Sequence, residues 1–98
     1  MEIQTKFFAA LREIVGKKFV MVELDDGARI KNVLRKLVET YGTHLEKHLF
    51  DEQGKLSASY QILINGINIG TLEGLETRLR EGDTIAILPP IGGGKTHT

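Results

Sequence analysis

The stretch that decides the fold is Ile30-Lys31-Asn32-Val33-Leu34-Arg35-Lys36-Leu37-Val38-Glu39-Thr40-Tyr41, which is followed by Gly42. Its apolar residues recur at intervals of three and four, which is the pattern of an amphipathic helix. Gly42 stands where a glycine commonly ends a helix. A helix with one apolar face must bury that face against another element. We therefore expect this helix to lie on a sheet, with its apolar face in the core: Ile30, Val33, Leu34 and Leu37.

Strands are predicted on both sides of this helix. Residues 2–8 and 18–24 each divide into two sets with period two, and residues 9–15 between them form a short helix-favouring run. The sets are Ile3, Thr5 and Phe7 against Gln4, Lys6 and Phe8, and Val20, Val22 and Leu24 against Phe19, Met21 and Glu23. Residues 60–64 and 67–69 flank Asn65-Gly66, the strongest short signal for a hairpin. Residues 84–88 form a last apolar run, typical of a strand buried on both faces in the middle of a sheet. We expect this strand beside the first one, and these strand residues in the core: Ile3, Phe7, Val20, Val22, Leu24, Ile62, Ile64, Ile85 and Ile87.

The remaining segments predict smaller elements. Thr43 and Glu46 have capping-box spacing, so residues 44–50 are expected to form a second short helix, with Thr43 as its cap. Residues 51–55 are a polar segment that we expect to be mobile, and residues 72–79 suggest a turn of helix. The order of elements is that of the β-grasp of ubiquitin-like proteins. The predicted fold class is α+β: a single β-grasp domain whose mixed sheet packs on one amphipathic helix.

Length and composition exclude several classes of function. The chain has 98 residues, enough for one domain. Its 13 Lys and Arg balance 13 Asp and Glu, so no basic excess directs it to nucleic acid or to an anionic membrane. It contains no cysteine, which excludes disulfides, a thiolate nucleophile and a Cys-based metal site. No apolar run reaches 18 residues, and we expect a soluble, cytoplasmic protein.

The end of the sequence reads Leu88-Pro89-Pro90-Ile91-Gly92-Gly93-Gly94, and Lys95-Thr96-His97-Thr98 follows. Proline lacks an N–H donor, so the prolines should end the last strand and lead the chain away from the sheet. Glycine has no Cβ and lets a backbone enter a channel too narrow for side chains. The sequence therefore predicts a flexible glycine segment that projects from the fold, either as a tail able to enter a narrow channel or as a frayed terminus or a remnant of expression.

Three motifs together carry a family resemblance. They are Phe8-Ala9-Ala10-Leu11-Arg12-Glu13, Glu81-Gly82-Asp83-Thr84-Ile85-Ala86 and the Leu88 to Gly94 tail. In this order and at these spacings, they resemble the MoaD/ThiS family of ubiquitin-like sulfur carriers, and most of all MoaD, the small subunit of molybdopterin synthase. The resemblance spans residues 3–94. It departs from the family at Arg29, where members commonly have Thr or Ser before the long helix, and in the four residues after Gly94.

The resemblance implies a chemistry for the tail. In the family, a ubiquitin-activating-type adenylyltransferase uses ATP to adenylate the α-carboxylate of the last glycine, here Gly94, and a sulfur donor converts the adenylate into a thiocarboxylate. The tail residues Pro89, Pro90, Ile91, Gly92 and Gly93 would then insert into the molybdopterin synthase large subunit. There the sulfur becomes part of the dithiolene that binds molybdenum or tungsten. The chain itself would bind no cofactor and act as a non-catalytic carrier. In the alternative, the same activated carboxyl modifies a lysine of a target protein.

The residues after Gly94 affect this mechanism. A thiocarboxylate needs a free α-carboxylate, whereas here a peptide bond joins Gly94 to Lys95. We therefore interpret residues 1–94 as the β-grasp domain with its diglycine tail. Residues 95–98 are either a pro-segment or a remnant of expression. The resemblance suggests a JAMM-type peptidase as the processing partner.

Other candidate sites are weaker. His44 and His48 are spaced four apart on a predicted helix, but no third zinc ligand is evident and no metal site is predicted. Arg12 and Glu13 are expected in surface ion pairs. Phe8 and Met21 lie opposite the predicted core faces of their strands and could form a docking surface for a partner. The other aromatic residues considered are expected in or beside the core: Phe7, Phe19, Phe50 and Tyr60.

Overall fold

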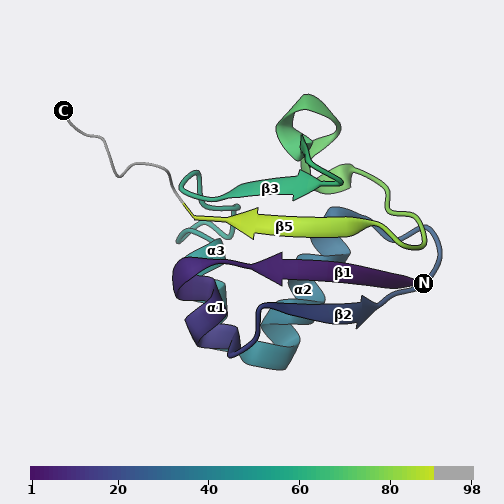
Figure 1. Cartoon of the computed structure of the whole chain (residues 1–98). Coiled ribbons are helices and arrows are strands. Elements are labelled where there is room, and N and C mark those ends of the chain that lie inside the picture. Colours follow the sequence, from purple (N-terminus) through teal and green to yellow (C-terminus); the bar gives the residue numbers. More distant parts are fainter. Residues whose placement is uncertain (90–98) are drawn as a thin grey trace.

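The computed structural model describes residues 1–89, which form one mixed sheet with helices against it. The order of the strands across the sheet is β2-β1-β5-β3-β4 (Figure 1). This arrangement confirms the predicted β-grasp. The strands are β1 (Glu2–Phe7), β2 (Phe19–Glu23), β3 (Gln61–Ile64), β4 (Ile67–Asn68) and β5 (Thr84–Leu88). The helices are α1 (Ala9–Val15), α2 (Ile30–Tyr41) and α3 (Thr43–Leu49), with 3-10 turns η1 (Ile69–Thr71) and η2 (Gly74–Glu76).

Strand β5 occupies the centre of the sheet, as the sequence predicts. It runs parallel to β1, with Phe7 paired to Ile87, and antiparallel to β3, with Ile62 paired to Ile87. The burial pattern alternates along β5, so only Ile85 and Ile87 are buried. The expectation that β5 is buried on both faces is therefore wrong. Its outward-facing residues are half-exposed because the helices cover one face of the sheet only (Figure 1).

The core lies between the sheet and α2. The predicted residues of α2, β1, β3 and β5 are all buried, and so is Val22. Val20 and Leu24, also expected in the core, are only half-buried. Val20 lies in β2 and Leu24 follows it. Because β2 is an edge strand, its inward side chains have a neighbouring strand on one side only and are less well covered. Six further core residues were not anticipated: Leu11, Val15, Leu45, Leu49, Ile69 and Leu79.

Gly42 joins the two helices α2 and α3. Its φ of 85° is in a region that glycine tolerates, and its N–H donates to the Val38 carbonyl at 2.8 Å, which ends α2. The same residue precedes α3 and its carbonyl accepts the Glu46 N–H at 3.2 Å. The prediction that Thr43 caps this helix is wrong, since Thr43 is already its first residue and no side-chain cap is formed.

The start of α2 compensates for the absence of Thr or Ser before the helix. Arg29 is the N-cap residue, and an arginine side chain has no hydrogen-bond acceptor. Instead, the Asn32 Oδ1 accepts the Arg29 backbone N–H at 2.7 Å. This bond is the return half of a capping box, made without a capping side chain.

The turn at Asn65-Gly66 and the turn before β5 are hydrogen-bonded to each other at the end of the sheet away from α1. Asn65 and Gly66 have φ of 51° and 85°, as the predicted type I′ hairpin requires. The Asn65 Nδ2 donates to the Asp83 Oδ1 at 2.9 Å, and the Asn65 Oδ1 accepts the Thr84 N–H at 3.0 Å.

The helical turn expected within residues 72–79 is only the 3-10 turn η2. Within residues 1–89, no helix is both long and apolar enough to cross a membrane.

Candidate functional site

The candidate site is the base of the tail, where β5 ends at Leu88 and the half-buried Pro89 follows. Because β1 and β5 are parallel, both end at the side of the molecule where α1 begins (Figure 1). Phe7 pairs with Ile87, so Phe8 is level with Leu88. The other predicted tail residues lie outside the described residues: Pro90, Ile91, Gly92, Gly93 and Gly94, together with residues 95–98.

Arg12 contacts the end of β1, next to the base of the tail. Its Nε donates to the Phe7 carbonyl at 3.2 Å, and its guanidinium lies 5.5 Å from the centroid of the Phe8 ring. This geometry is a cation–π contact. The surface ion pairs expected for Arg12 and Glu13 do not form among residues 1–89. The sequence signal for the contact is the spacing of four between Phe8, which precedes α1, and Arg12 on its last turn.

Tyr60 flanks the tail base from the β3 side, a position that no local pattern in the sequence indicates. Gln61 pairs with Leu88, so Tyr60, one residue earlier, is level with Pro89. The Tyr60 hydroxyl lies 3.2 Å from the Nδ1 of His48 on α3. Burial raises the pKa of Tyr60, since the phenolate would lose hydration. The neutral phenol thus packs against the core beside α3, on the strand next to the start of the tail.

The two histidines considered for zinc are close to each other, with ring centroids 5.5 Å apart. In the part of the chain that the structure describes, no group of three or more His, Cys, Asp or Glu residues could hold a metal ion. His48 has a structural contact with Tyr60 instead.

The outer face of the sheet, away from the helices, carries exposed apolar side chains. Met21 is 51% exposed and Phe19 is 48% exposed. They pair with Gln4 and Lys6 of β1, whose side chains alternate with the buried Ile3, Thr5 and Phe7. The expectation that Phe19 is in or beside the core is therefore wrong. It shares a face with Met21 because side chains two apart on a strand point the same way.

Phe8 continues this outer face beyond the end of β1. Its backbone is still extended, with φ −136° and ψ 153°, and its side chain is half-buried. Phe8 and Met21 are separated along β1 by four residues, or about 13 Å, too far for contact. Phe19, opposite Lys6, lies between their levels. We call Phe8, Phe19 and Met21 the outer-face patch.

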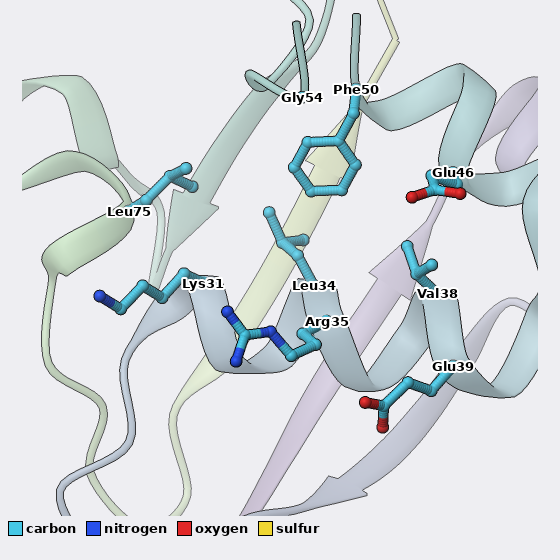
Figure 2. Close-up of a pocket in the computed structure, with 9 residues that line it drawn as sticks. All are labelled: Lys31, Leu34, Arg35, Val38, Glu39, Glu46, Phe50, Gly54 and Leu75. Carbon is cyan, nitrogen blue, oxygen red and sulfur yellow. The ribbon is translucent and has the colours of Figure 1, made fainter. Parts of the chain in front are cut away.

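A hollow of about 340 Å³ lies on the other side of the molecule, against α2. Figure 2 shows Leu34 and Phe50 pointing toward one another there, with charged side chains of α2 around them. Lys31, at one end, donates to Glu76 at 2.8 Å. None of the tail-base or outer-face residues lines this hollow. Its full lining is Lys31, Leu34, Arg35, Val38, Glu39, Glu46, Phe50, Gly54 and Leu75.

Known proteins resemble this arrangement over nearly its whole length. The ThiS family profile matches residues 5–94. Small archaeal modifier protein 3 of Haloferax volcanii is 35% identical over 94 residues, covering 96% of this chain and 100% of that protein. The crystal structure of SAMP1 from Haloferax volcanii superposes with a TM-score of 0.84 at 31% identity, covering 96% of this chain and 100% of that one. The molybdopterin synthase sulfur carrier subunit of Chlamydomonas reinhardtii is 25% identical over 95 residues, covering 96% of this chain and 100% of that protein.

Proposed function

Since the chain belongs to the ThiS family of ubiquitin-like proteins, we propose that it is a carrier whose C-terminal glycine is activated by a partner enzyme. The observation that carries this proposal is the placement of β5. The strand lies in the centre of the sheet and ends at Leu88, and the sequence after it is Pro-Pro-Ile-Gly-Gly-Gly. A rigid domain with a glycine tail attached to its central strand suits delivery of a terminal carboxylate into an enclosed active site.

The proposed activation proceeds in two steps. The Gly94 carboxylate attacks the α-phosphorus of ATP on a ubiquitin-activating-type adenylyltransferase, which yields the acyl-adenylate and pyrophosphate. A nucleophile then attacks the acyl carbon, and AMP leaves. This chain contains no cysteine, so a sulfur nucleophile must come from another molecule. The outer-face patch is the proposed docking surface during both steps, because the exposed Phe19 and Met21 gain from burial against a partner and the half-buried Phe8 continues the same face.

The nucleophile in the second step defines the biological role. If a lysine amine attacks, the carbonyl of Gly94 forms an amide with a target protein and the chain is a modifier. The 35% identity with a small archaeal modifier, against 25% with a molybdopterin synthase subunit, favours this fate. If a sulfide donor attacks, a thiocarboxylate forms. The second candidate is therefore a sulfur carrier that works with the large subunit of molybdopterin synthase, supported by the match to a sulfur carrier subunit.

Three forms of the chain test the activation step: the full sequence, a form ending at Gly94 and the same form with Gly94→Ala. We expect ATP–pyrophosphate exchange with the adenylyltransferase only for the second form. The alanine methyl group would clash in a channel shaped for glycine, and in the full sequence the carboxyl is an amide. Exchange by the full-length chain, with its mass verified as intact, would refute both the role of Gly94 and the proposal that a JAMM-type peptidase removes residues 95–98.

Intact-mass measurement of the form ending at Gly94, expressed in its source cell, separates the two fates. Replacement of one oxygen by sulfur, and loss of the dithiolene cofactor when the gene is deleted, would support sulfur carriage. Conjugates on target lysines, with the cofactor unaffected, would support the modifier. If neither product forms while exchange still occurs, both fates are wrong and only the activation step stands.

A further inference from the structure

The two edges of the sheet are built differently. Strand β4, at one edge, is only two residues long. Strand β2, at the other edge, has five residues, and four of them are consecutive and apolar: Phe19, Val20, Met21 and Val22. Proteins usually shorten an edge strand or place a charge within it, because a free edge can pair with another strand. Only the β4 edge is shortened, and no charge interrupts the apolar residues of β2.

Every second residue of β2 has backbone groups without a hydrogen-bond partner among residues 1–89. Met1 and Leu24 exchange backbone hydrogen bonds at 2.7 and 2.9 Å, and the Phe7 N–H donates to the Lys18 carbonyl at 2.8 Å. In an antiparallel pair such bonds alternate along the strand. The even-numbered residues of β2 therefore bond to β1. The N–H and C=O groups of the odd-numbered residues point out at the free edge: Phe19, Met21 and Glu23.

The charges at the two ends of β2 are of opposite sign. Lys17 and Lys18 directly precede the strand, whereas Glu23 ends it and Asp25 lies just beyond. Lys17 and Asp25 are both exposed, and no ion pair among residues 1–89 uses them. An antiparallel partner strand with the same sequence would place its acidic end against the basic end of this one. Opposite charges directly across two strands stabilise their pairing.

We propose that the chain forms a two-fold symmetric homodimer in which β2 of one copy pairs antiparallel with β2 of a second copy, centred on Met21. In this register Phe19 lies opposite Glu23 of the second copy, and Lys17 lies opposite Asp25 of the second copy. Because of the two-fold symmetry, each of these pairs occurs twice in the dimer. All residues paired by hydrogen bonds are odd-numbered, as the free backbone groups require. On the inner face, Val20 lies opposite Val22 of the second copy.

A shallow hollow of about 130 Å³ between β2 and α2 supports this register. It is lined by Val20 and Val22 from the strand and by Leu37, Thr40 and Tyr41 from the helix, among others. The inward valines of the second copy would adjoin this hollow and extend the apolar layer beneath the sheet. The dimer leaves the end of β5, and hence the base of the tail, on a different strand from the interface. The proposal does not depend on the fate of Gly94.

Sedimentation equilibrium of the full chain, at concentrations up to about 1 mM, tests the dimer. We expect the wild-type chain to dimerise and Lys17→Asp and Asp25→Lys each to weaken dimerisation about tenfold, because each variant places two like-charged pairs across the interface. An equimolar mixture of the two variants should form heterodimers. In these, the aspartate introduced at position 17 faces the lysine introduced at position 25, and the native Lys17 and Asp25 face each other in the second pair. Both positions are exposed, so circular dichroism should show an unchanged fold.

Amide hydrogen exchange locates the interface independently. The N–H groups of Phe19, Met21 and Glu23 should exchange slowly in the wild-type dimer and quickly in either single variant. A wild-type chain that stays monomeric over the whole concentration range overturns the proposal. This holds even if the β2 edge is then found to pair with an extended peptide from another protein. A dimer that both charge variants leave unchanged, or in which these three amides stay unprotected, would place the interface elsewhere and equally overturn it.

Discussion

Thr5 offers a direct test of how the centre of the sheet is stabilised. It lies in β1 with no exposed surface, paired to Val20 on one side and to Ile85 on the other. Within residues 1–89, its Oγ1 has no hydrogen-bond partner. A buried hydroxyl without a partner costs about 1–3 kcal/mol relative to its hydrated state in the unfolded chain. Valine has nearly the same shape, and a methyl group carries no such cost.

We therefore expect Thr5→Val to raise the free energy of unfolding by about 1–2 kcal/mol. For a domain of this size, that corresponds to a melting temperature higher by about 4–8 °C per kcal/mol. Urea denaturation followed by circular dichroism measures the change, and the slope of the transition should stay constant because the surface exposed on unfolding is the same.

Thr77→Val is the matched control. Thr77 is also buried, but its Oγ1 accepts the Glu73 N–H at 3.1 Å, so the same substitution should lower stability by about 1 kcal/mol. If Thr5→Val is no more stable than the wild-type chain, the Thr5 hydroxyl has a partner such as a bound water, and the reasoning is refuted.

Other parts of the fold give three further predictions. Leu37→Ala, at a side chain 2% exposed, should lower the free energy of unfolding by about 2–5 kcal/mol, and a change under about 0.5 kcal/mol in urea denaturation would remove Leu37 from the core. Hydrogen bonds from Lys31, and to a smaller extent from Arg29, lower the pKa of Glu76. The contribution of the ionised Glu76 carboxylate to stability should therefore be present near neutral pH and lost as the pH falls through the lowered pKa. Thermal melts of the wild-type chain and Glu76→Gln should therefore converge in acid, and a difference that persists there would contradict this assignment. Phe19→Ser should raise the KM of the adenylyltransferase for the chain ending at Gly94 without changing its circular dichroism, and an unchanged KM would remove Phe19 from the docking surface.

The parts of the fold that could be predicted are those that local patterns determine. The apolar stripe of residues 30–41 and the alternation in residues 2–8 specify which faces are buried, and Asn65-Gly66 specifies its own turn. The exposure of Phe19 and the partial exposure of Val20 and Leu24 could not be read in the same way. They depend on which strand is at the edge of the sheet, and strand order is a property of the whole chain.

The candidate site was predictable to the same limited extent. The sequence identified the glycine tail and the outward direction of Phe8 and Met21. It could not place Tyr60 beside Pro89, because that neighbourhood arises from the pairing of β3 with β5, whose residues lie far apart in the chain. Nor could it show that Arg12 stacks on Phe8, since the same residue could equally have formed an ion pair.

The central position of β5 also controls when the domain can fold during synthesis. Before residues 84–88 are available, the strand that joins the hairpins β2–β1 and β3–β4 is missing, and neither hairpin has its full set of strand partners. An isolated two-stranded hairpin is at best marginally stable. The parallel contact between β1 and β5 closes a loop of nearly the whole chain, which is slow in folding terms. A chain truncated before Thr84 would thus lack a joined sheet, whereas any chain that carries the glycine segment also carries the strand that completes the domain.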